Sequence, residues 1–91
     1  MGDVGISSLS RVIPHLFRLE ILFLYKNSIT DSGAIELARA IDMLEHLQVL
    51  SLDTNRIADD GALHLANSIY KQKEMKEVYL YFNEIGDKGM I

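Results

Sequence analysis

The feature that most constrains this chain is a spacing of 28 residues, which separates Asn27, Asn55 and Asn83. The same interval relates aspartate, glycine and several aliphatic positions, so it carries apolar residues as well as polar ones. A period of this length that repeats its apolar set indicates stacked units that bury little on their own. The chain is therefore expected to form a short solenoid, and its function should depend on what that solenoid presents at its surface.

Each period contains the pattern of a short strand. Two apolar residues separated by a variable one stand ahead of each asparagine, at Leu22 and Leu24, Leu50 and Leu52, and Val78 and Leu80. Such alternation is typical of a strand with one buried face. The variable residues are therefore expected to point to solvent.

A helical pattern follows each strand. Apolar residues recur at helical spacing, at Ala34, Leu37, Ala38, Ile41 and Leu44, and again at Ala62, Leu65, Ala66 and Ile69. Asp31 and Asp59 precede these stretches and are predicted to cap the helices. In the first period Pro14 predicts that the helix ends at about Val12 or Ile13.

The third helix has an unusual end. Gln72 stands where the other periods carry Leu16 and Leu44, within the polar stretch 71–74. This substitution predicts a looser, wetter helix end than in the preceding period.

The repeat register sets the expected organisation. We expect one segment, 1–91, with units at about 1–18 (partial), 19–46, 47–74 and 75–91 (partial). The register starts at a helix and stops at the beginning of another, which favours a fragment of a longer array. The alternative is a small protein that completes its edges by oligomerising. In either case the open ends predict marginal stability or self-association.

Composition narrows the classes of partner. The net charge of −4 argues against nucleic acid as a partner. The absence of cysteine excludes disulfides and thiolate metal sites and fits a reducing compartment. The longest apolar run, 21–25, is too short to span a bilayer, so no membrane partner is expected. A cytoplasmic location is the resulting expectation, with the nucleus as the other reducing compartment.

Nothing in the sequence predicts an active site. His15, His46 and His64 fall at different positions of the period and do not converge. The aspartates of the 28-residue column would be spaced on the order of 10 Å apart, too far to share a cation that needs oxygens at about 2.3–2.6 Å. We therefore expect no enzyme activity, no metal and no cofactor.

The pattern Leu-x-x-Leu-x-Leu-x-x-Asn-x-Ile-x-Asp-x-Gly-Ala-x-x-Leu-Ala describes residues 19–38 and 47–66, and residues 75–89 follow it with Met75 and Val78 in place of leucine. It resembles the ribonuclease-inhibitor-like class of leucine-rich repeats. The resemblance implies an α/β horseshoe segment with parallel strands on the concave face and helices on the convex face. It also places Asn27, Asn55 and Asn83 at the turns that leave the sheet, where their amides form an internal ladder.

The variable strand residues are the candidates for binding a partner. They include an aromatic group with one carboxylate: Phe23, Tyr25, Asp53, Tyr79 and Tyr81. Tyr25 and Tyr81 should flank Asp53, while Phe23 and Tyr79 flank Ser51, which predicts a shallow groove with a polar floor. Two alternatives remain open: aromatic residues favour strands for their own sake, and Phe82 could tuck into the coil.

The leading hypothesis is a protein-interaction module that binds a protein partner on its concave face. The resemblance implies it, because such arrays occur in ribonuclease inhibitors, in the sensing region of NOD-like receptors and in actin-regulatory scaffolds. A second hypothesis is part of a Ran-type GTPase-activating protein, which needs rim loops and an acidic tract after the array. A third is a structural spacer between other domains.

Overall fold

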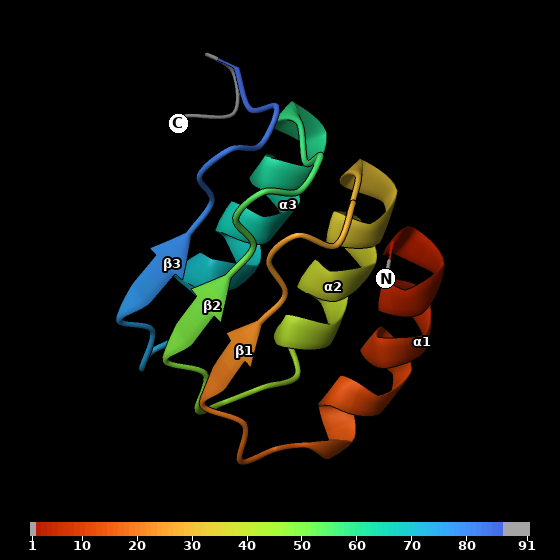
Figure 1. The fold of residues 1–91 in the computed structure, drawn as a ribbon. Coiled ribbons are helices and arrows are strands. Elements are labelled where there is room, and N and C mark those ends of the chain that lie inside the picture. Colours follow the sequence, from red (N-terminus) through yellow and green to blue (C-terminus); the bar gives the residue numbers. More distant parts are fainter. Residues whose placement is uncertain (1, 87–91) are drawn as a thin grey trace.

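The structure is a computed structural model that describes residues 2–86. Helices and short strands alternate along the chain, in the order α1 (Gly2–Val12), the 3₁₀ turn η1 (Ile13–His15), β1 (Ile21–Phe23), α2 (Asp31–Ile41), β2 (Val49–Ser51), α3 (Asp59–Tyr70) and β3 (Glu77–Tyr79). The helices lie side by side in one layer and the strands in another (Figure 1). This arrangement confirms the predicted α/β solenoid segment.

The strands form a parallel sheet in the order β1-β2-β3. Residues related by the 28-residue interval pair directly, so Phe23 lies beside Ser51 and Ser51 beside Tyr79. Pairing continues past the strands, because the Lys26 N–H donates to the Asp53 carbonyl at 3.0 Å. The Thr54 N–H donates to the Tyr81 carbonyl at 2.8 Å in the same way. The sequence period is therefore also the register of the sheet.

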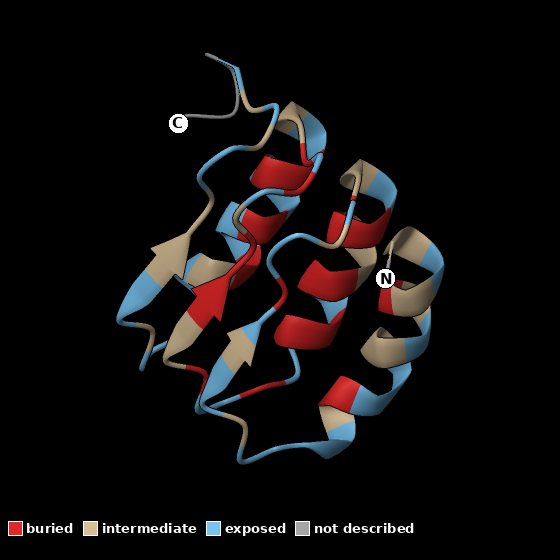
Figure 2. Cartoon of the chain, viewed as in Figure 1, coloured by how far each residue is buried: buried red, intermediate tan, exposed pale blue. Residues whose placement is uncertain are grey.

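The core lies between the two layers (Figure 2). Leu50 and Leu52 of the middle coil are fully buried, whereas their counterparts Leu22 and Leu80 are only half-buried. The middle coil is better covered because it has a neighbour on each side. Helices contribute Leu37, Ile41 and Leu65, which are also fully buried. Each unit thus depends on its neighbours for burial, as expected of a solenoid.

Helix α1 ends at Val12, as predicted from Pro14, and the chain continues into η1. Proline is tolerated there because the first residues of a 3₁₀ turn need no backbone N–H donor. The predicted strand alternation is also confirmed.

The predicted capping role of the aspartates is wrong. Asp31 and Asp59 are the first residues of α2 and α3, and neither helix has a side-chain cap. The Asp31 carboxylate instead accepts a hydrogen bond from the Ala58 N–H at 2.7 Å, one coil further on. Asp59 accepts from the Gly86 N–H at 2.7 Å, and Asp3 accepts from the Thr30 N–H at 2.8 Å. Stacking brings the backbone just ahead of the next helix within reach of the carboxylate, which therefore joins neighbouring coils.

The predicted wet helix end is wrong at Gln72. Its side chain is only 9% exposed, and its Nε2 donates to the Ile41 carbonyl at 3.0 Å. Lys71, Lys73 and Glu74 around it are exposed. The glutamine side chain fills the position that leucine occupies in the other units, and its amide finds a carbonyl at the end of α2.

Candidate functional site

The three asparagines follow the strands and point back toward the preceding coil. Asn55 is 6% exposed. Its Oδ1 accepts from the N–H groups of Asn27 at 2.9 Å and Ile29 at 3.0 Å. Its Nδ2 donates to the carbonyls of Leu24 at 3.0 Å and Leu52 at 2.9 Å. The Asn55 side chain is thus occupied in holding one coil on the next and is not free to contact a ligand.

Asn83 makes equivalent bonds, although it is less buried. Its Oδ1 accepts from the Ile57 N–H at 3.0 Å and its Nδ2 donates to the Leu52 carbonyl at 2.9 Å. Asn27, in the first coil, donates to the Tyr25 carbonyl at 3.0 Å. The structure therefore places all three residues in the scaffold, with Asn55 and Asn83 forming the bonds between coils.

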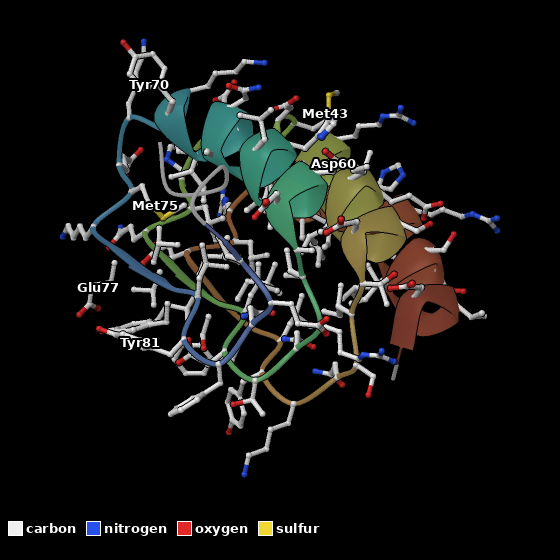
Figure 3. The ribbon with its side chains drawn as sticks, turned by 90° about the horizontal axis from the view of Figure 1, so that it is seen from above. Met43, Asp60, Tyr70, Met75, Glu77 and Tyr81 are labelled. Atoms are coloured by element: carbon white, nitrogen blue, oxygen red, sulfur yellow. The ribbon has the colours of Figure 1, made fainter. Side chains whose placement is uncertain are left out.

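The variable strand residues point away from the helices. We call the surface that they form the open sheet face; it corresponds to the predicted concave face and comprises Ile21, Phe23, Tyr25, Val49, Ser51, Asp53, Glu77, Tyr79 and Tyr81. Figure 3 shows Glu77 and Tyr81 on this side of the molecule, while Met43 and Asp60 lie on the helix side. The face is made by rigid backbone, because its strands are paired.

The open sheet face is hollowed at its middle strand, β2, where the side chain is small. Ser51 of β2 is flanked by Phe23 and Tyr79, and it is only 6% exposed although it lies on the outer face. The larger side chains stand on either side of it and cover it. The result is a hollow of about 290 Å³, which we call the aromatic recess, lined by Phe23, Tyr25, Ser51, Asp53 and Tyr79.

Four of the five residues predicted to bind a partner line this recess, and the fifth, Tyr81, lies outside it. Tyr81 is 67% exposed and follows β3 on the same face. On the other side of the recess, the rings of Phe23 and Tyr25 lie 6.4 Å apart between centroids, in a tilted arrangement. This distance is within the range in which aromatic pairs attract.

Asp53 is held in place by the neighbouring strand. Its Oδ1 accepts a hydrogen bond from the Tyr81 N–H at 2.7 Å. A carboxylate held by a backbone donor has little freedom to turn away, so its charge stays at the recess. Sequence reasoning placed Asp53 on this face but missed this bond, which depends on how the side chain reaches across to β3.

Tyr79 is also positioned by a hydrogen bond. Its hydroxyl donates to Oε1 of Glu77 at 2.8 Å, two residues earlier on the same strand face. This bond and the negative charge of Glu77 raise the pKa of Tyr79 above its usual value of 10.0. The spacing of two residues on a strand was the signal for this contact, because residues i and i+2 share a face.

Phe82 does not tuck into the coil. It is 83% exposed, and its backbone has a positive φ of 58°. The structure thus argues against the alternative in which Phe82 packs into the coil and does not face a partner.

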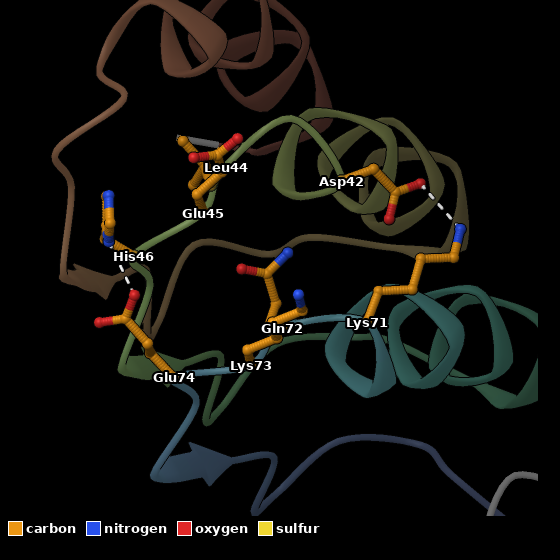
Figure 4. A pocket seen from close by; sticks show the side chains of 8 residues that line it. All are labelled: Asp42, Leu44, Glu45, His46, Lys71, Gln72, Lys73 and Glu74. Atoms are coloured by element: carbon orange, nitrogen blue, oxygen red, sulfur yellow. Dashed lines mark hydrogen bonds and ion pairs between the residues drawn. The ribbon is translucent and has the colours of Figure 1, made fainter.

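A larger hollow lies elsewhere, where the second and third coils return from helix to strand (Figure 4). It measures about 480 Å³ and is lined mainly by charged residues. His46 Nδ1 lies 2.7 Å from Glu74 Oε2, and Lys71 Nζ lies 3.6 Å from Asp42 Oδ2. These contacts tie the two coils together, so these four side chains are engaged in joining one coil to the next. The aromatic recess, which four of the five predicted partner-binding residues line, is the better candidate for a binding site.

Within residues 2–86, no group of three or more histidine, aspartate and glutamate side chains could hold a metal ion. None of the helices described there combines the length and apolar character needed to cross a membrane.

The fold and the asparagine bonds define a leucine-rich-repeat solenoid. The sequence profile of the family described as Leucine Rich repeat matches residues 44–66 and 75–91. Comparison with curated proteins gives no match. The solved structure of "Leiomodin-1 Actin-Binding Site 2 (ABS2)" superposes with a TM-score of 0.83 at 15% sequence identity. The match covers 98% of this chain and 53% of that one, so the present chain spans about half of its neighbour's length. The profile and the shared fold support a leucine-rich-repeat family, without deciding the class of repeat.

Proposed function

We propose that this chain is a protein-interaction module of the ribonuclease-inhibitor-like repeat class and that it binds a protein partner on the open sheet face. One observation carries the proposal: aromatic side chains surround a recess whose floor is formed by Ser51 and Asp53. A solenoid that served only as a spacer would need no such hollow on its sheet.

The exposed area of these residues supports the proposal. Phe23 is 58% exposed, Tyr25 53% and Tyr81 67%. Tyrosine and phenylalanine supply large contact areas while losing little conformational entropy, and for this reason they are enriched at interfaces. The exposed apolar residues of the helix side, such as Val4 and Leu63, are dispersed over different helices. The aromatic residues of the sheet, in contrast, are adjacent.

The neighbour with the same fold supports a protein partner. It is named as an actin-binding site, so this fold carries a protein-binding surface in that protein. At 15% identity the comparison carries the fold and not the partner. We therefore propose a protein partner for this chain without assigning actin.

Site-specific photo-crosslinking in the full-length protein would test the proposal. A photo-reactive phenylalanine analogue at Tyr81 should crosslink to a protein partner, which is then purified and tested for direct binding. Replacing Tyr25, Tyr79 and Tyr81 together by serine should weaken that binding strongly, because interface aromatic residues carry a large share of the binding energy.

A matched control uses the helix side. The same analogue at Tyr70, which is 92% exposed and ends α3, should not crosslink to that partner, and Tyr70→Ser should not weaken binding. If the triple variant bound every partner as well as the unaltered protein does, the open sheet face would not be the interface. Light scattering on both proteins would show whether self-association through the solenoid ends competes with binding.

A further inference from the structure

The aromatic recess differs in charge from an ordinary apolar hollow. Three of its five lining residues are aromatic, at Phe23, Tyr25 and Tyr79, and a fourth is the carboxylate of Asp53. The faces of aromatic rings are electrically negative and attract cations. The ring faces and the carboxylate therefore both favour a cationic ligand.

The geometry fixes this charge in the recess. Asp53 uses Oδ1 to accept from the Tyr81 N–H, and within residues 2–86 no donor bonds to its other carboxylate oxygen. The lining includes no lysine or arginine. Lys26 follows Tyr25 in the chain and Lys76 precedes Glu77, both residues of the open sheet face, but neither lysine lines the hollow. The Asp53 carboxylate is thus held and lacks a cationic partner inside the recess.

A second carboxylate lies close to the recess wall. Glu77 accepts the hydroxyl proton of Tyr79 in a hydrogen bond of 2.8 Å, so its charge is held against one of the lining residues. The Tyr79 hydroxyl is directed to Glu77, which leaves it unable to donate to Asp53 at the same time. The negative potential of the recess is therefore not cancelled by its own tyrosine.

The size of the recess limits what it can hold. Parallel strands are about 4.8 Å apart, so the aromatic side chains on β1 and β3 stand roughly 10 Å apart on either side of β2. With rings occupying part of this width, a single extended side chain fits between them. A hollow of about 290 Å³ is at the lower limit of small-molecule pockets, which suits one side chain of a larger partner.

We propose that the aromatic recess receives a basic side chain, arginine or lysine, from the protein partner. The cationic group contacts the Asp53 carboxylate and the faces of the aromatic rings. The aliphatic part of the same side chain packs against Phe23, Tyr25 and Tyr79. Such a contact combines cation–π attraction with a charge-assisted hydrogen bond. It rests on the proposed function and adds the chemistry that the partner must present.

Short peptides test this directly on the 91-residue chain. Three peptides of the form acetyl-Gly-Ser-X-Ser-Gly-amide carry arginine, citrulline or leucine at X. Citrulline has nearly the shape of arginine without its charge, and leucine is apolar. Binding is followed by ¹⁵N–¹H correlation spectra through the amide signals of Phe23, Tyr25, Asp53 and Tyr79.

The arginine peptide should shift these signals and bind at least about fivefold more tightly than either neutral peptide. Asp53→Asn should remove most of this preference. This variant isolates the effect of the charge, because an asparagine Oδ1 still accepts from the Tyr81 N–H while the negative charge is lost. Asp60→Asn is the matched control, because Asp60 is an exposed carboxylate on the helix side (Figure 3), and it should leave the preference unchanged.

Three outcomes would overturn the inference. Equal binding of the arginine and citrulline peptides would show that the recess does not select charge. An arginine preference that survives in Asp53→Asn would show that the cation does not meet the Asp53 carboxylate. Absence of shifts at these residues with all three peptides would show that the recess does not receive a side chain. Each of these results leaves the photo-crosslinking test intact, since a partner could still dock on the open sheet face through other contacts. If crosslinking fails and the peptides behave as expected, the recess binds cations but the proposed protein interface is wrong.

Discussion

The side-chain amide of Gln72 donates to the main-chain carbonyl of Ile41, the last residue of α2, at 3.0 Å. The last carbonyls of a helix have no partner within the helix, and here the following coil supplies a second donor to one of them. The Leu44 N–H donates to the same carbonyl at 2.9 Å. One polar residue in a leucine position thus links the end of one helix to the return segment of the next unit.

Two replacements of Gln72 should distinguish the contribution of its hydrogen bond to stability from the contribution of its side-chain volume. Gln72→Glu removes the donor and buries a charge, and it should lower the free energy of unfolding by about 2–3 kcal/mol. Gln72→Leu also removes the bond, but it removes the Oε1 that lacks a partner within the described residues and restores the leucine of the other units. It should stay within about 1 kcal/mol of the unaltered protein.

Urea unfolding at neutral pH measures both changes. Asn67→Asp, an amide-to-acid change at an exposed position of the same helix, is the control and should have little effect. A Gln72→Glu protein as stable as the Asn67→Asp protein would mean that the amide bond to Ile41 contributes nothing.

The asparagine bonds predict a graded set of losses. Asn55→Ala removes buried bonds to the carbonyls of Leu24 and Leu52 and to the N–H of Ile29, and it should cost about 3 kcal/mol or more because several buried polar groups lose their partners. Within residues 2–86, Asn27→Ala removes one exposed side-chain bond, and it should cost less than about 1 kcal/mol. Thermal and urea unfolding give the comparison, and equal losses would contradict a role of Asn55 between coils.

Gly61 should not tolerate a side chain. A Cβ placed there would lie 2.5 Å from Asp31 Oδ1 and 3.0 Å from the Cβ of Ala34. Alanine usually stabilises a helix relative to glycine by about 1 kcal/mol. Gly61→Ala should instead destabilise by about 1–3 kcal/mol, because it forces apart α2 and α3 and disturbs the Asp31 bond to Ala58.

Gly86→Ala is the control for this prediction. A Cβ at Gly86 would meet the Asp59 oxygens at 3.6 Å, an ordinary contact distance. Its unfolding midpoint should stay close to that of the unaltered protein. If Gly61→Ala were as stable as Gly86→Ala, the close approach of the two helices would not limit this position.

Much of the fold follows from the sequence period alone. The 28-residue spacing predicted the strand register, because identical units stack with equivalent residues side by side. Pro14 predicted the end of α1 through its missing N–H. Both inferences use properties of a residue type or of one repeat unit, so they do not require the side-chain contacts between neighbouring coils.

The roles of Asp31 and Gln72 could not be predicted in this way. An aspartate at the start of a helix can bond to its own helix or to a neighbouring backbone, and the distance between coils decides which. A glutamine in a leucine position can be wet or buried, depending on whether a free carbonyl lies nearby. For the same reason the candidate residues of the recess were found, while the bond that fixes Asp53 was not.

The residue before each asparagine has a costly backbone conformation. Thr54 has a φ of 58°, and Lys26 and Phe82 at the equivalent positions have the same value. Left-handed geometry costs an ordinary residue roughly 1 kcal/mol, and a β-branched side chain is a particular outlier there. Thr54→Asn should therefore raise stability by up to about 1 kcal/mol, because asparagine adopts this region more readily. Arg56→Asn, which changes the same turn at a residue without positive φ, should give no gain in the unfolding midpoint.

The Tyr79–Glu77 contact predicts a pH effect with a defined sign. The pKa of Tyr79 is raised in the folded protein, chiefly by its hydrogen bond to Glu77 and then by the charge of Glu77. A raised folded pKa means that the contribution of the bond is fully present below the unfolded pKa, near 10.0, and is lost as the pH rises through the folded pKa. An absorbance titration of the tyrosines should therefore lose an alkaline component in Tyr79→Phe. In Glu77→Gln the same component should move toward lower pH, because the amide keeps an acceptor for the hydroxyl but carries no charge. A titration curve unchanged by Glu77→Gln would show that Glu77 does not hold the Tyr79 proton.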